Sequence, residues 1–260
     1  MLALCRALLR RTIREYRWRL VVVPAALGLG VVLLSLVATR FTGGFTPATR
    51  RSLEGFAESF LGSTSTSAVA VAFVLFQMPT IVLLFSSATA SSIAQNLVGD
   101  ELRRGSLEVL LTAPVSRPKV VGSLLGTTVA LATTSFAVFA GTALGSAVVA
   151  LRLIDAPPVD LPTRYWLLVG PLPFAVVILS AALSLLVAVR FPIVGELRAG
   201  TLNVSQTLAT MPALALLLYL TARPGLPSTG LLVVTSVLAL TGAAAAWIYA
   251  RSQLPKVIFR

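Results

Sequence analysis

The charged residues of this chain gather in one short segment, residues 99–119, which reads GDELRRGSLEVLLTAPVSRPK. Seven of its residues are charged, whereas Asp, Glu, Lys and Arg make up only 12% of the whole chain. Glu101, Arg104 and Glu108 follow one another at i, i+3 and i+7, so a helix through them carries all three on one stripe. The pattern predicts an amphipathic helix whose charged stripe is available for ionic contacts with a partner.

Glycine and proline set the limits of this predicted helix. Gly105 inside it costs about 1 kcal/mol relative to Ala, so something other than helix propensity favours a position without a side chain, and close approach of another backbone is one candidate. Pro114 ends the helix, and Pro118 begins the next one. Arg117 and Lys119 then lie at the membrane edge.

A second stretch repeats part of the pattern. ELRRGSLEV at 101–109 matches ELRAGTLNV at 196–204 as Glu-Leu-Arg-x-Gly-(Ser or Thr)-Leu-x-Val. The repeat is either a coincidence in a chain of limited alphabet or a second surface presented to the same partner. In the second interpretation the contact residues are Glu196, Arg198, Gly200 and Thr201.

The residue inventory excludes most catalytic and metal sites. Cys5 is the only cysteine and there is no histidine, so the chain forms no internal disulfide and offers no ordinary zinc or haem site. An intramembrane enzyme is poorly supported, because the serines have no nearby base. No G-x-x-x-x-G-K-(S/T) phosphate loop occurs, so any ATP-driven role requires another chain and the chain itself needs no cofactor.

Hydropathy predicts the elements that position the charged segment. The mean hydropathy is +0.92, far above that of soluble proteins. A membrane span needs about 20 apolar residues, and none of the candidate windows contains a charged residue or a histidine. The fold class predicted is all-α and integral to the membrane, with six transmembrane helices and the amphipathic helix between the second and third. The six windows are 20–38, 68–90, 120–151, 165–189, 202–221 and 229–250.

The basic residues predict how these spans are oriented. With the N-terminus inside, the cytoplasmic segments hold 15 of the 21 Lys and Arg residues: six before the first span, four in 99–119, two in 190–201 and three after 250. This distribution agrees with the positive-inside rule for an even number of spans with both termini in the cytoplasm. The net charge of +12 therefore indicates a multi-pass protein of the cell membrane, in contact with the lipid bilayer, and not a nucleic-acid partner.

The chain divides into three parts on this basis. Residues 1–19 are predicted to form a cytoplasmic amphipathic helix in the interface, or a plain positive-inside anchor. Residues 20–250 form the six-span domain, and 251–260 form a cytoplasmic tail. In the first outer loop, a stripe at helical spacing between Pro47 and Gly62 predicts a short helix that rests on the membrane or caps the spans.

The third predicted span carries features of close helix packing. It runs for about 32 residues, so it should tilt or project from the hydrocarbon. Gly122 and Gly126 form one small-xxx-small pair, and Gly141 and Gly145 form another. Hydroxyls along it can bond across helices, and a polar substrate path is the alternative interpretation.

The segment 99–126 resembles that of ABC transporter permeases of the exporter-like ABC-2 type, which runs acid, charged residues, Gly-Thr-Leu-Glu, apolar residues, Pro, a small residue and Ser-Arg. The resemblance implies that the amphipathic helix is a coupling helix seated in a groove on a separate ATPase subunit, which holds ATP and Mg²⁺. It also implies a permease homodimer or heterodimer with two such subunits. Two departures are Ser123, where the family often has Lys, and residues 222–228, which are too short for the helical hairpin of many members. The coupling residues it implies, with Arg104 from the charged stripe, are Glu101, Arg104, Gly105, Ser106, Leu107, Glu108, Leu111, Pro114, Ser116 and Arg117.

Two other functions remain open from the sequence. An ion-coupled secondary carrier is possible with sodium held by backbone and hydroxyl oxygens, although the absence of buried acids argues against proton coupling. A membrane anchor that transports nothing is the other. The substrate is not indicated by any residue pattern.

Overall fold

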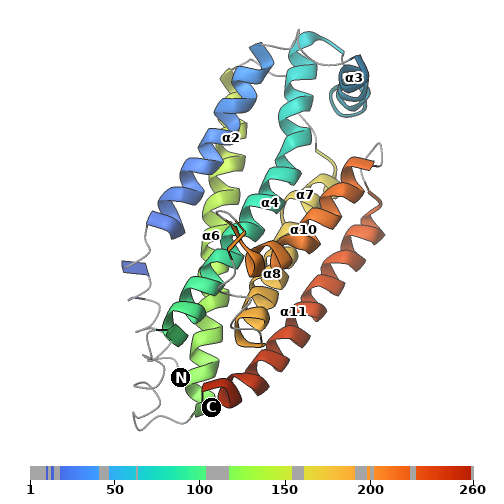
Figure 1. Cartoon of the computed structure of the whole chain (residues 1–260). Helices are drawn as coiled ribbons and strands as arrows, with labels where there is room; N and C mark the ends of the chain where they lie inside the picture. The colour runs from blue at the N-terminus through green and yellow to red at the C-terminus, as the bar shows by residue number, and fades with distance from the viewer. Residues whose placement is uncertain are drawn as a thin grey trace.

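The computed structural model describes residues 10, 13–14, 18–40, 47–62, 64–103, 117–153, 161–190, 198–199, 202–222 and 227–258, and these form a bundle of helices (Figure 1). The elements in chain order are the π-helix η1 (Trp18–Val22), α2 (Val23–Arg40), α3 (Pro47–Leu61), α4 (Thr66–Arg103), α6 (Arg117–Leu153), α7 (Thr163–Val169), α8 (Pro171–Arg190), the two-residue strands β1 (Arg198–Ala199) and β2 (Leu202–Asn203), α10 (Val204–Ala222) and α11 (Thr229–Ile258).

The helices are those of a multi-pass membrane protein. Within the described residues, four stretches are long and apolar enough to cross a membrane: Val71–Gln95, Gly122–Val149, Thr163–Val187 and Thr229–Gln253. Two shorter apolar stretches, Leu20–Gly30 and Thr207–Tyr219, lie in η1–α2 and in α10. The helical architecture predicted from hydropathy is therefore confirmed, and four of the six predicted spans meet the length and composition required to cross a membrane.

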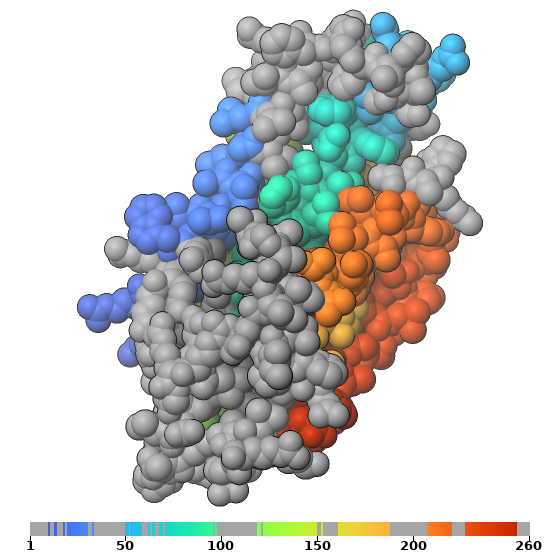
Figure 2. All heavy atoms as spheres, viewed as in Figure 1, coloured from blue at the N-terminus to red at the C-terminus, as the bar shows by residue number. Residues whose placement is uncertain are grey.

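Two helices organise the packing. α8 lies between α4 and α11 and makes its most extensive contacts with them, while α2 packs on α6 and α6 packs on α4. α10 crosses both α4 and α8. Figure 2 shows α2, α4, α10 and α11 following one another across one face of the molecule. α4 and α8 therefore form the centre of the bundle.

Several helices extend beyond or divide the predicted windows. α4 continues past Ala90 to Arg103, and α6 has 37 residues, about 56 Å at 1.5 Å per residue. The fourth window is divided: α7 ends at Val169, Gly170 follows it, and α8 begins at Pro171, which has no backbone N–H to continue the α7 ladder. α11 extends through Ile258, into the predicted tail. The predicted helix over 1–19 lies mostly outside the described residues.

The predicted outer-loop helix is present as α3. It begins at Pro47 and ends at Leu61, and Gly62 follows with a φ of +62°, which favours glycine. Ala57 is fully buried, and the Phe56 ring meets the Phe76 ring of α4 edge to face at 6.0 Å. α3 thus caps the end of α4 through its apolar stripe.

One hydrogen bond joins α7 to the middle of α4. Pro79 inside α4 has no N–H, so the carbonyl of Leu75 lacks the donor that an α-helix provides four residues on. The buried Tyr165 hydroxyl donates to that carbonyl oxygen at 2.9 Å. An unpaired carbonyl is costly in hydrocarbon, so the bond offsets the cost of the proline.

A close approach joins α2 to α6. A Cβ built on Gly28 would collide with Thr142 Oγ1 and lie 3.0 Å from the backbone nitrogen of Ala143. Ser146 Oγ, which donates to the Thr142 carbonyl oxygen of its own helix at 2.5 Å, lies 3.4 Å from the Gly28 carbonyl oxygen across the same contact. By contrast, Gly141 and Gly145 are exposed with open space at the Cβ position, so this predicted small-residue pair is not used for packing by the described residues.

The first prediction is a double-mutant cycle on the Leu75 carbonyl. Tyr165→Phe should lower the free energy of unfolding by about 1–2 kcal/mol, because a buried carbonyl loses its donor. In the Pro79→Ala background the same change should cost clearly less, since alanine at this position would supply a helical N–H. Unfolding in mild detergent measures both, with the exposed Tyr249→Phe as control. Equal costs in the two backgrounds would show that the hydroxyl does not compensate for Pro79.

The second prediction compares two glycines of α2. Gly28→Val should lower the free energy of unfolding by about 1–3 kcal/mol, because the side chain has no room against α6. Gly30→Val makes the same change in helix propensity at a position with no atom within 4 Å of its Cβ. Thermal unfolding followed by circular dichroism would measure both. A Gly30 variant as damaged as the Gly28 variant would contradict the close approach.

Candidate functional site

The predicted coupling segment connects α4 to α6. α4 carries the helix through Glu101 and ends at Arg103, and α6 begins at Arg117. In Figure 1 both of these helix ends lie at the lower end of the bundle, near the end of α11. The structure thus sets the segment between two long apolar helices. The remaining predicted contacts, Arg104, Gly105, Ser106, Leu107, Glu108, Leu111, Pro114 and Ser116, lie outside the described residues.

The two flanks of the segment are firmly packed. On α4, Ala94 and Leu97 are buried, and on α6, Val120 and Leu124 are buried. A force applied to the segment would therefore act on helices that are held by the core, and not on loosely attached ends.

Ser123 faces the interior of the bundle. Its side chain is fully buried, and its hydroxyl donates to the Lys119 carbonyl oxygen at 2.7 Å one turn earlier. Lys119 itself is exposed. The position where the resembled family often has Lys is thus occupied here by a packed residue, while Lys119, one turn earlier, is exposed.

The second motif contributes a short hairpin. Arg198 pairs with Asn203 and Ala199 pairs with Leu202 in the antiparallel β1–β2 pair. In Figure 1 this hairpin lies higher along the bundle than the end of α4. The other predicted contacts of this motif, Glu196, Gly200 and Thr201, lie outside the described residues.

A polar seam, which we define as Ser87, Ser91 and Gln95 of α4 with Ser180 and Ser184 of α8, runs through the centre of the bundle. All five residues are buried. Ser184 Oγ donates across the helix pair to the Ser91 carbonyl oxygen at 3.0 Å, and Ser91 Oγ donates to the Ser87 carbonyl oxygen at 2.9 Å. Ser180 Oγ and Gln95 Nε2 have no hydrogen-bond partner among the described residues.

The chemistry of the seam is limited to neutral hydrogen bonding. It contains no acid, base or thiol, so it cannot transfer a proton or attack a substrate. No group of three or more His, Cys, Asp or Glu side chains capable of holding a metal occurs in the part of the chain that the structure describes. The seam ties α4, the helix that leads into residues 104–116, to α8.

Sequence reasoning did not single out the seam. Its signal is the i, i+4 spacing of Ser87, Ser91 and Gln95, repeated in Ser180 and Ser184, within the apolar stretches Val71–Gln95 and Thr163–Val187. The hydroxyls of the third predicted span are more numerous, but those of Thr127 and Thr128 are used within their own helix, where they donate to the carbonyl oxygens of Ser123 and Leu124 respectively.

Comparison of the chain with protein-family models, with curated proteins and with solved structures found no match. The resemblance of residues 99–126 to ABC-2 permeases therefore rests on that segment.

The third prediction concerns two equally buried serines of α8. Ser184→Ala should lower the free energy of unfolding by about 0.5–1 kcal/mol, because the bond to the Ser91 carbonyl is lost. Ser180→Ala should not lower it, because this hydroxyl has no partner in the described structure. Unfolding of both variants in the same detergent provides the comparison. A larger loss for the Ser180 variant would mean that the seam is bonded differently.

Proposed function

We propose that this chain is the membrane-spanning permease subunit of an ATP-driven ABC transporter of the exporter-like type. In this proposal residues 99–119 dock on a separate ATPase subunit, which binds ATP and Mg²⁺. The observation that carries the proposal is the match of this charged segment to the coupling segment of such permeases. Its location between the ends of α4 and α6 supports the proposal.

The proposal counts six spans with both termini in the cytoplasm of a cell-membrane protein. α2 and α10, with 18 and 19 residues, are about 27 Å and about 29 Å long at 1.5 Å per residue. Those lengths are close to the roughly 30 Å of a bilayer's hydrocarbon core. With the four longer stretches they make an even number of crossings, in agreement with the distribution of basic residues.

The proposed mechanism is mechanical. Closure of two ATPase subunits on ATP would move the docked segments of a permease dimer as rigid bodies. Each segment is continuous with α4 and connects directly to α6, so both helices would move with it. The polar seam and the apolar contacts between α4 and α8 would pass the motion to the centre of the bundle.

A sodium-coupled carrier is the second candidate, because the polar seam offers neutral oxygen ligands in the membrane interior. Ser180 Oγ is fully buried and lacks a partner among the described residues. Hydroxyl and carbonyl oxygens can coordinate sodium without a carboxylate. In this case transport would follow a sodium gradient and would not need ATP.

The identifying experiment is purification of the C-terminally tagged protein in mild detergent from its own cells. A soluble subunit with a phosphate loop, recovered at about one per permease chain, would support the ATP-driven function. Recovery of the chain alone, under conditions that preserve a known transporter complex, would favour the carrier.

The fourth prediction tests the charged stripe directly. Glu108→Lys should weaken co-purification of the ATPase by at least about tenfold, because it reverses one charge of the docking surface. Glu58→Lys makes the same change at an exposed position of α3, at the other end of α4, and should leave association unchanged. Both variants should insert normally. Full ATPase recovery with the Glu108 variant would remove this stripe from the interface.

A further inference from the structure

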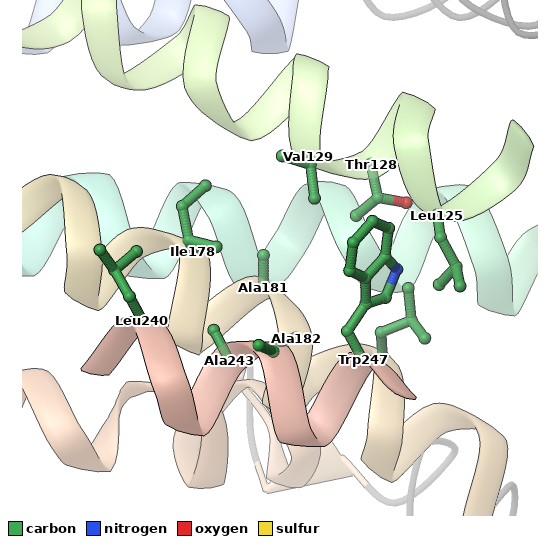
Figure 3. A pocket seen from close by; sticks show the side chains of 11 residues that line it. Leu125, Thr128, Val129, Ile178, Ala181, Ala182, Leu240, Ala243 and Trp247 are labelled. Atoms are coloured by element: carbon green, nitrogen blue, oxygen red, sulfur yellow. The ribbon is translucent and has the colours of Figure 1, made fainter. Parts of the chain in front are cut away.

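An apolar pocket of about 230 Å³ lies between α6, α8 and α11 (Figure 3). Figure 3 shows the Trp247 ring reaching from α11 toward Thr128 and Leu125 of α6. The residues that line the pocket are Leu125, Thr128, Val129, Ile178, Ala181, Ala182, Leu185, Leu240, Ala243, Ala244 and Trp247.

The lining selects a hydrocarbon occupant. The only side-chain hydroxyl is that of Thr128, and it already donates to the Leu124 carbonyl oxygen at 3.0 Å. The pocket therefore has little to offer a water molecule, which needs two to four polar partners. An apolar cavity of about 150 Å³ holds a benzene molecule, so this pocket has room for a longer stretch of hydrocarbon.

The pocket is accessible from the hydrocarbon of a bilayer. All of its lining residues belong to the apolar stretches Gly122–Val149, Thr163–Val187 and Thr229–Gln253. Its α11 side is open to the surroundings: Leu240 is 43% exposed and Trp247 is 41% exposed. Because acyl chains are the medium around such a surface, they can reach the pocket without crossing a polar layer.

Two exposed cations lie toward one end of the pocket. Lys119 precedes Leu125 on α6 by six residues, about 9 Å, and Arg251 follows Trp247 on α11 by four residues, about 6 Å. The start of α6 and the end of α11 lie at the same end of the bundle (Figure 1). None of the three lining helices contains an Asp or Glu. On the lining helices themselves, the charge at this end therefore favours an anionic group.

We propose that this pocket binds one acyl chain of an anionic phospholipid, whose headgroup phosphate is held by Lys119 and Arg251. The Trp247 indole, near the end of its apolar stretch, lies at the depth where tryptophan favours the boundary between acyl chains and headgroups. The lipid site does not depend on an ATPase partner, so it can be tested independently of the proposed transport function.

Trp247 is a built-in reporter for the test. The chain has three tryptophans, so Trp18→Phe and Trp166→Phe leave Trp247 as the only one. This protein is reconstituted in phosphatidylcholine vesicles containing increasing fractions of phosphatidylglycerol with brominated acyl chains, which quench tryptophan on contact. Quenching should saturate, with its midpoint at a mole fraction about fivefold lower than for brominated phosphatidylcholine, a preference that a single surface Lys or Arg can give.

Matched variants separate the two halves of the site. The double substitution Lys119→Gln, Arg251→Gln should bring the quenching curves of the two lipids together. The control is the double substitution Arg152→Gln, Arg164→Gln, which should leave the curves apart. Arg152 is exposed near the end of α6 that is far from Lys119, and Arg164 is exposed near the start of α7. Ala244→Phe fills the pocket and should abolish the saturating component. Ala245→Phe, one residue on and outside the pocket lining, should retain it.

Three results would overturn the proposal. Coincident curves for the two lipids in the parent protein would remove the anionic headgroup. A saturating component that survives Ala244→Phe would locate the lipid elsewhere. Absence of quenching by both lipids would mean that protein, such as a second copy of this chain, covers the pocket.

Discussion

A backbone carbonyl in hydrocarbon must find its hydrogen-bond donor within the protein, and the rest of this bundle depends on how that requirement is met at Leu75. Pro79 removes the helical donor, and the Tyr165 hydroxyl replaces it. Because Tyr165 lies on α7, the bond fixes α7 against the middle of α4. α8 begins only two residues after α7 ends, at Pro171, so the same contact limits where α8 can run. α8 then provides the surface on which α11 packs.

Much of the helical framework could be predicted, because a run of about 20 apolar residues in a chain with few charges has few alternatives to a buried or membrane-spanning helix. The ends of the long apolar helices could not be predicted. α4 reaches Arg103 because backbone hydrogen bonding continues through the mixed polar and apolar residues after Ala90, and a hydropathy average does not register backbone hydrogen bonds. The break between α7 and α8 at Gly170 falls inside an apolar window, so hydropathy does not reveal it. Pro171 is a local sign of the break in the sequence. α3 was predictable at both ends because proline and glycine mark them.

One candidate site could be located from the sequence and the other could not. A membrane protein has few places for charge, so composition alone located residues 99–119. The polar seam could not be found in this way, because Ser184 and Ser91 are 93 positions apart and only the folded bundle brings them together. Glycine spacing was also insufficient: Gly141 and Gly145 have the spacing of a packing motif and face open space, whereas Gly28 makes the close contact with α6. The spacing of glycines shows where a helix surface has no side chains, but it does not show whether another helix packs there.

α11 comes after every helix it touches, and its most extensive contacts are with α8. During synthesis the apolar stretches of α4, α6 and α8 therefore leave the ribosome before α11 does, and their contacts with one another can form without it. The faces of α6 and α8 that line the apolar pocket are open to lipid in that interval. A molecule resting there would be enclosed when α11 arrives, so the pocket can be filled during biogenesis as well as by exchange in the finished protein.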